Sequence, residues 1–138
     1  MGHLATSFLE EQQTPVAEQS SAARAIENYV ELYLNGVAKR ESHMRALYAI
    51  MGESVSSVPE IRSDVARLTR GMRRNMAEWV RRGMGSGEFR ADVDPDAAAT
   101  MIIGLLRGVT FQALIDPRDV KVKELIPLVQ RQIILSLT

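Results

Sequence analysis

The stretch GEFRADVDPDAAATMIIGLLRGVTFQALIDPRD, residues 87–119, decides the fold of this 138-residue chain. Asp94 is a good N-cap, Pro95 suits the first helical position, and Asp96 adds negative charge where the helix dipole favours it. The spacing therefore predicts a helix from Asp94 to about Ile115, which the DPRD turn ends. This helix is apolar on nearly all sides, so it needs neighbours on all sides.

Gly104 and Gly108 lie four residues apart on this helix, flanked by Met101 and Phe111. A helix-interior glycine costs about 1 kcal/mol relative to alanine, and close approach of another helix compensates for that cost. A glycine tolerated without a role is the alternative. Because five or six helices cannot surround this one, we expect it and the last helix to form a twofold homodimer face. The residues predicted for this face are Met101, Gly104, Leu105, Gly108, Ile126, Val129 and Ile133.

The rest of the sequence shows helical spacing and no sustained two-residue alternation, so no sheet is expected. The predicted helices cover residues 20–40, 42–52, 59–84, 94–115 and 122–137. Gly52 would end the second helix, the glycines at 83, 85 and 87 would end the third, and Pro127 would kink or delay the last. We predict an all-α antiparallel bundle of five to six helices over residues 20–138, preceded by a partly mobile segment, residues 1–19.

Composition excludes several classes of protein. The 17 basic and 17 acidic residues cancel, which disfavours a chain that coats nucleic acid or an anionic membrane. Cysteine is absent, and His3 and His43 are the only histidines, so we expect no metal site, no cofactor and no catalytic constellation. The longest apolar run has ten residues, short of the ~20 that cross a bilayer. The N-terminus lacks a signal-peptide pattern, which predicts a cytoplasmic location.

Seven arginines lie between Arg62 and Arg82, against Asp64 and Glu78. They suggest either an anion or nucleic-acid surface, or a solvated face whose arginine stems cover apolar surface. No aromatic residues alternate with them, so we favour the solvated face. An inward-turned Arg73 or Arg74 could pair with an anionic effector, but the apolar stripe of this helix places neither inward.

The order of these elements and the phrase GMGSGEFRADVDPDAAATMIIGLLRGVTFQALIDP resemble the C-terminal regulatory domain of TetR-family transcriptional repressors. In that family, a phrase G-E-F/L-R-x-D-x-D-P-x-x-A-A marks the turn between the long pocket-lining helix and the first dimerisation helix. The matching residues here are Gly87, Glu88, Phe89, Arg90, Asp92, Asp94, Pro95, Ala98 and Ala99. The resemblance covers residues 22–137.

Such repressors carry a helix-turn-helix domain ahead of this region, and residues 1–19 are too short to form one. These residues resemble the tail of a connecting helix. Either the DNA-binding domain was trimmed from this chain, or the chain is a stand-alone relative; the sequence fits both. DNA contact is thus expected only through a domain not present in this chain.

The resemblance implies a small hydrophobic effector held between the helices of each protomer. A pocket of this kind is mostly apolar with a few orienting polar groups, and methionine, tyrosine and tryptophan suit it. The candidate ligand-binding residues are Tyr29, Tyr33, Met72, Met76, Trp79 and Phe111, with Arg107 and Gln112 as further candidates. Core packing is the plain interpretation of each one singly. The alternative function is a ligand-free helical homodimer that acts as an interaction or scaffolding module.

Overall fold

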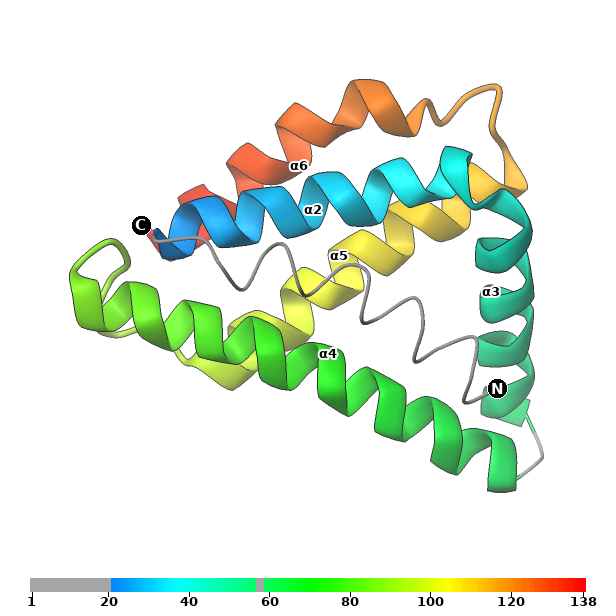
Figure 1. Cartoon of the computed structure of the whole chain (residues 1–138), viewed down its shortest axis with the longest axis horizontal. Coiled ribbons are helices and arrows are strands. Elements are labelled where there is room, and N and C mark those ends of the chain that lie inside the picture. Colours follow the sequence, from blue (N-terminus) through cyan, green and yellow to red (C-terminus); the bar gives the residue numbers. More distant parts are fainter. Residues whose placement is uncertain (1–20, 57–58) are drawn as a thin grey trace.

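The computed structural model describes residues 21–56 and 59–138, which form five helices and no strand (Figure 1). The helices are α2 (Ala22–Lys39), α3 (Glu41–Ser56), α4 (Pro59–Ser86), α5 (Pro95–Ile115) and α6 (Val122–Leu137). The all-α prediction is confirmed. The expected connecting-helix tail, residues 1–19, lies outside the described residues.

α2, α3 and α4 lie along the three sides of a triangle, and α5 runs diagonally across it (Figure 1). α2 and α6 pack side by side, and α3 crosses one end to join α2 to the start of α4. α5 passes behind, packed on α4, α2 and α6. A single core cluster includes residues of all five helices, with Ile26, Leu34, Met44, Met76 and Leu106 fully enclosed. Each helix thus buries one apolar stripe against the others.

Two predicted helix ends are wrong. α3 does not stop at Gly52 but continues to Ser56, where Ser54 is buried and its hydroxyl donates to the carbonyl of Met51 at 2.6 Å. α4 includes Gly83 and Gly85 and ends only before Gly87, whose φ is +85°. A left-handed backbone is costly for residues with a Cβ, so Gly87 is the glycine that the turn requires. Pro127 lies within α6, which begins without delay at Val122.

The phrase after Gly87 joins three helix ends. The Glu88 carboxylate accepts from the Ser21 hydroxyl at 2.7 Å and from the backbone N–H groups of Ala22 and Ala23 at the start of α2. These hydrogen bonds, together with the one from the Ser86 hydroxyl, lower the pKa of Glu88 from 4.5 to about 2. A carboxylate at a helix N-terminus also complements the helix dipole. Glu88 therefore holds α2 against the α4–α5 turn.

Phe89 and Arg90 secure the ends of α4 and α6. The Phe89 ring packs directly on Gly83, where any Cβ would clash, and its N–H donates to the Gly83 carbonyl at 3.0 Å. The N–H of Arg90 donates to the carbonyl of Leu137 at 2.9 Å, and its guanidinium donates to that of Ser136. These contacts satisfy carbonyls that helix ends leave open. The residues that carry the sequence resemblance therefore act here as structural clamps.

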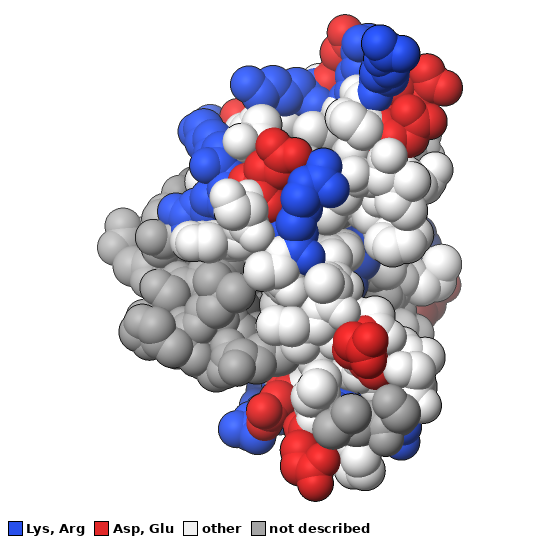
Figure 2. Space-filling model, turned by 90° about the vertical axis from the view of Figure 1, so that its right-hand side faces the viewer, with Lys and Arg blue, Asp and Glu red and all other residues white. Residues whose placement is uncertain are grey.

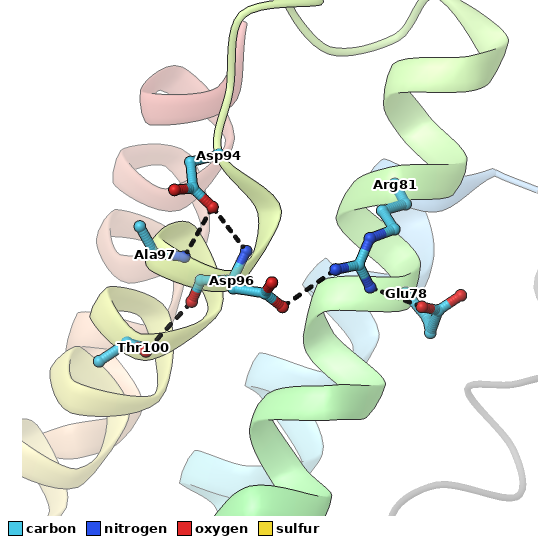
Figure 3. A network of polar contacts seen from close by, with 6 residues as sticks. All are labelled: Glu78, Arg81, Asp94, Asp96, Ala97 and Thr100. Carbon is cyan, nitrogen blue, oxygen red and sulfur yellow. Dashed lines mark hydrogen bonds and ion pairs between the residues drawn. The ribbon is translucent and has the colours of Figure 1, made fainter.

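The start of α5 matches its prediction (Figure 3). The Asp94 side chain accepts from the N–H groups of Asp96 and Ala97 at 3.1 and 3.2 Å, as an N-cap does. Arg81 of α4 bridges Asp96 at 3.0 Å and Glu78 at 2.6 Å. This pairing ties the first turn of α5 to α4.

By length and composition alone, α5 could cross a membrane: it has 21 residues, and an 18-residue window within it has a mean hydropathy of 1.6. The ten-residue apolar run in the sequence underestimated the length of this apolar helix, because α5 continues well beyond the run. In the fold, α5 packs against α2, α4 and α6 and carries Arg107 toward α4. Such packing is typical of the central helix of a bundle.

Candidate functional site

Five of the six predicted ligand residues lie in the core. Tyr29, Tyr33, Met72, Met76 and Trp79 are all buried. The Tyr29 ring lies 5.4 Å from that of Trp79 and 6.1 Å from that of Tyr33, in tilted arrangements that aromatic pairs favour. α2 and α4 thus present an aromatic and methionine surface to each other. Burial alone agrees with core packing as well as with a pocket wall.

Arg107 gives this region its polar character. From α5 its guanidinium reaches α4, where Nη1 donates to Thr69 Oγ1 at 3.0 Å and Nη2 to Met72 Sδ at 3.3 Å. Its Nε is buried and has no hydrogen-bond partner in the described part of the chain. No carboxylate pairs with Arg107 among the described residues. Arg107 is only partly buried as a residue, but its enclosed Nε is costly to leave without a hydrogen bond.

Two tyrosines from different helices meet beside this charge. Tyr33 of α2 and Tyr48 of α3 share a hydrogen bond of 2.6 Å between their hydroxyl oxygens. Burial raises the pKa of each phenol, and of Tyr29, above the ordinary value of 10, while the charge of Arg107 partly opposes this. The phenols are therefore neutral hydrogen-bond donors at physiological pH.

Thr110 adds a second unmatched polar atom. It lies one turn after Arg107 on α5 and is 0% exposed, and its Oγ1 makes no hydrogen bond of good geometry with the described residues, although it lies close enough to Tyr48 to lower the pKa of that phenol. A buried hydroxyl without a partner costs about 1–3 kcal/mol. We call the group formed by Tyr29, Tyr33, Tyr48, Thr69, Met72, Trp79, Arg107 and Thr110 the α2–α5 cluster.

The sequence indicated only part of this cluster. Tyr48, Thr69 and Thr110 were not candidates, and Arg107 was a secondary one. A signal for Arg107 did exist, because it is the only charged residue of α5 beyond Asp96. Nothing in the local pattern marked Thr69, which faces α5 only because α4 and α5 cross at that point.

Phe111 does not belong to this cluster, so its assignment to the pocket is corrected. It is 54% exposed and lies on the outer face of α5, in line with Met101, Gly104, Gly108 and Ile115. The spacing of these five residues alternates between three and four, which places them on one helical stripe. A Cβ at either glycine would meet no atom of the described chain within 4 Å.

The predicted interface residues divide between two faces. Met101 is 75% exposed, and Gly104, Leu105 and Gly108 are exposed beside it. Ile126, Val129 and Ile133 of α6 are instead buried within the protomer. The apolar residues that α6 exposes are Leu128 and Leu135. The periodicity gave the stripes of α6 correctly, but α2 covers the one that the sequence assigned to a partner.

Three hollows open on the described part of the chain, and none of these three is lined by Tyr33, Met76 or Trp79. One of ≈370 Å³ lies where the ends of α2 and α5 meet the start of α6, lined by both acidic and basic side chains. Figure 2 shows this end of the bundle, with charges of both signs gathered in its upper part and uncharged side chains across its middle. A second, of ≈440 Å³, lies between α5 and α6 on the exposed apolar face. The third, of ≈420 Å³, lies between α3 and α4 and reaches Thr69.

Comparisons with known proteins identify the fold and the family. Two solved structures share the fold at 17% sequence identity each: the fatty acid degradation regulator FadR from Bacillus halodurans, with a TM-score of 0.81, and the MbdR regulator from Azoarcus sp. CIB, with a TM-score of 0.77. The matches cover 94% and 97% of this chain, and 66% and 75% of those chains, respectively. A search of curated proteins finds no match.

The family model of the BetI-type transcriptional repressor C-terminal domain matches residues 22–135. These residues include all five helices except the last two residues of α6. The family is one of transcription regulators and is not enzymatic. The clamps at Glu88, Phe89 and Arg90, the capped α5 and the five-helix arrangement therefore belong to a C-terminal domain of the TetR family of transcriptional regulators.

Proposed function

We propose that this chain is the effector-binding and dimerisation domain of a TetR-type transcriptional repressor. Membership of the family supports the general role, and two features of this chain support its two parts. The α2–α5 cluster would bind the effector, and the outer stripe of α5 would bind a second copy of the chain. Contact with DNA would require a helix-turn-helix domain, and the cytoplasm would be the place of action.

The observation that carries the effector site is the set of unmatched polar atoms in the core. Arg107 Nε and Thr110 Oγ1 make no good hydrogen bond with the described residues, and the Tyr29 and Trp79 rings of the same cluster offer an apolar surface. A ligand with a polar group and an apolar body would satisfy both kinds of surface. Met72 and Met76 can rearrange around it, since methionine adapts to irregular shapes.

The outer stripe of α5 supports a twofold dimer. Met101, Phe111 and Ile115 are each more than half exposed, and Leu128 and Leu135 of α6 extend the apolar surface. Gly104 and Gly108 leave open space between these side chains, in which a partner helix could approach closely. Two such helices from each protomer would form a four-helix interface.

α5 would connect the two activities because it carries both. Arg107 and Thr110 face the protomer interior, whereas Gly108 and Phe111, within one turn of them, face outward. A ligand that pulls on Arg107 would alter the position of α5 in the dimer face. The effect requires that the ligand prefer one dimer arrangement, because equal affinity for both would shift nothing.

The only tryptophan, Trp79, reports on this site directly. We expect at least one member of a panel of small cationic, neutral and anionic organic compounds to change Trp79 fluorescence saturably and to raise the melting temperature. Calorimetry on Trp79→Phe would check that the fluorescence change reports binding. Light scattering after size-exclusion chromatography should give the mass of a dimer at micromolar concentration.

The two measurements separate the alternatives. A dimer that no compound affects would favour the scaffolding module. A stable monomer that binds a compound would remove the dimerisation part and leave the effector site. A monomer without a ligand would contradict both parts.

A further inference from the structure

The hollow between α3 and α4 is basic. It is lined by Ser54, Val55, Arg62, Val65, Ala66, Thr69 and Arg73, with a volume of ≈420 Å³. We call it the α3–α4 hollow. Two of its seven lining residues are arginines, and none is acidic. The remaining lining residues offer short apolar side chains and two hydroxyls.

Thr69 connects this hollow to the α2–α5 cluster. Its hydroxyl donates to the Val65 carbonyl at 2.8 Å and accepts from Arg107 Nη1 at 3.0 Å. Arg107 therefore lies directly behind the wall of the α3–α4 hollow. Arg62 and Arg73 line the hollow itself, and Arg107 contacts its wall through Thr69.

These three arginines differ from those that neutralise carboxylates elsewhere. Arg45 pairs with Glu41, Arg67 with Asp64, Arg81 with Glu78 and Asp96, and Arg90 with Asp92. Within the described ranges, Arg62 donates only to the Ser54 carbonyl, at 3.2 Å, and neither it nor Arg73 or Arg107 is in an ion pair. The nearby Asp64 is engaged by Arg67 at 2.7 Å. The positive charge around the hollow is thus uncompensated within residues 21–56 and 59–138.

We propose that the effector is an organic anion that enters through the α3–α4 hollow, an inference that rests on the proposed function of the α2–α5 cluster. Its charged group, a carboxylate or a phosphate monoester, pairs with Arg107 beside Thr69, with Arg73 as a second contact and Arg62 at the opening. Val55, Val65 and Ala66 form the apolar part of the passage through which it enters.

The chemistry of the cluster selects this class. A guanidinium binds carboxylate and phosphate oxygens through two parallel hydrogen bonds, which are among the strongest in proteins. A cationic ligand would instead be repelled by Arg107, which no carboxylate of the described chain neutralises.

Probes that share a carbon skeleton but differ in charge test whether the site prefers an anion. On three skeletons, phenyl, phenylethyl and octyl, the carboxylate or phosphate monoester is compared with the neutral amide and the amine, by Trp79 fluorescence and by calorimetry. We expect at least one anion to bind ten or more times tighter than its amide, and its amine to bind more weakly still. Binding of inorganic phosphate alone would show recognition of the charge without the apolar body. Comparing the carboxylate with the phosphate monoester on the same skeleton shows which of the two anionic groups is preferred.

Variants then locate the contact. Arg107→Met should abolish the preference for the anion over the amide, and Arg107→Lys should retain part of it. Arg73→Gln should weaken anion binding several-fold. Arg74→Gln is the matched control, since Arg74 is the next residue of α4 and is exposed; it should leave binding unchanged. Circular dichroism melting shows that each variant is folded.

The inference is overturned if an amide or amine binds as tightly as its anion, or if Arg107→Met leaves the ratio of their affinities unchanged. In both cases a ligand still binds, so the proposed function stands. If none of the probes binds in any charge state, this inference and the effector-binding part of the proposed function fail together.

Discussion

The outer face of α5 exposes apolar side chains to solvent, whereas its inner face buries polar atoms that lack hydrogen-bond partners in the described chain. The outer face exposes Met101, Phe111 and Ile115 without protein against them, while the inner face encloses Arg107 Nε and Thr110 Oγ1 without hydrogen-bond partners in the described chain. A protein that works as a monomer without a ligand usually buries large apolar side chains of this kind and gives its buried polar atoms hydrogen-bond partners. The difference motivates the two proposals for this helix: an apolar partner surface against its outer face and a polar ligand group against its inner face.

The largest expected effect breaks the outer side of this comparison. Phe111→Asp would place a charge in the proposed apolar interface, where an unpaired buried charge costs about 3–5 kcal/mol. We expect the dimer dissociation constant, measured by analytical ultracentrifugation, to rise by about 100-fold or more. Val55→Asp is the matched control, because Val55 is 81% exposed but lies on α3. An unchanged dimer in Phe111→Asp would show that the subunits meet elsewhere.

The next effect concerns Glu88, which holds the start of α2 against the turn between α4 and α5. Glu88→Gln keeps the shape of the side chain but loses charge-assisted hydrogen bonds to the start of α2, worth about 1.5–3 kcal/mol together. We expect a lower free energy of unfolding in urea at pH 7.

The pH dependence of this loss has a definite sign. Because the pKa of Glu88 falls from 4.5 to about 2 on folding, its contribution is present above pH 4.5 and is lost as the pH falls toward 2. The wild type and Glu88→Gln should therefore converge in stability across this window. A difference that stays constant down to pH 3 would mean that the charge of Glu88 contributes little.

A smaller effect tests the unpaired hydroxyl of Thr110 on the inner face of α5. Thr110→Val replaces a buried hydroxyl without a partner by a methyl group of similar size, which should raise the stability of the ligand-free protein by about 1 kcal/mol. Thermal denaturation measures this change. Destabilisation of the same size would show that the hydroxyl has a partner, such as water, and would remove one of the two unmatched inner atoms.

The smallest effect compares glycines. Gly104→Ala should raise the stability of the protomer by about 1 kcal/mol through helix propensity, since its Cβ meets open space. The same change should weaken the dimer if a partner helix packs there. Gly83→Ala is the contrasting variant and should destabilise the protomer, because its Cβ would clash with Phe89. Stronger dimerisation of Gly104→Ala would argue against close helix approach.

Local signals sufficed for most helix boundaries. Asp94 and Pro95 start α5, Ser21 starts α2, and Pro59 begins α4, since caps and prolines act on the chain within a few residues. Gly52 misled because a glycine ends a helix only when the chain turns there, and the buried Ser54 keeps α3 intact. The five core members of the predicted ligand set were found because they share apolar stripes.

The sequence by itself determined the all-α class, the inward stripes and the clamp phrase, because helical periodicity and capping depend on neighbours three or four residues away. Only the tertiary structure decided that Phe111 faces outward while Ile126, Val129 and Ile133 face inward, and that Arg107 meets Thr69 and Met72. Periodicity shows that two residues share a face, but the packing of helices distant in sequence fixes what that face touches.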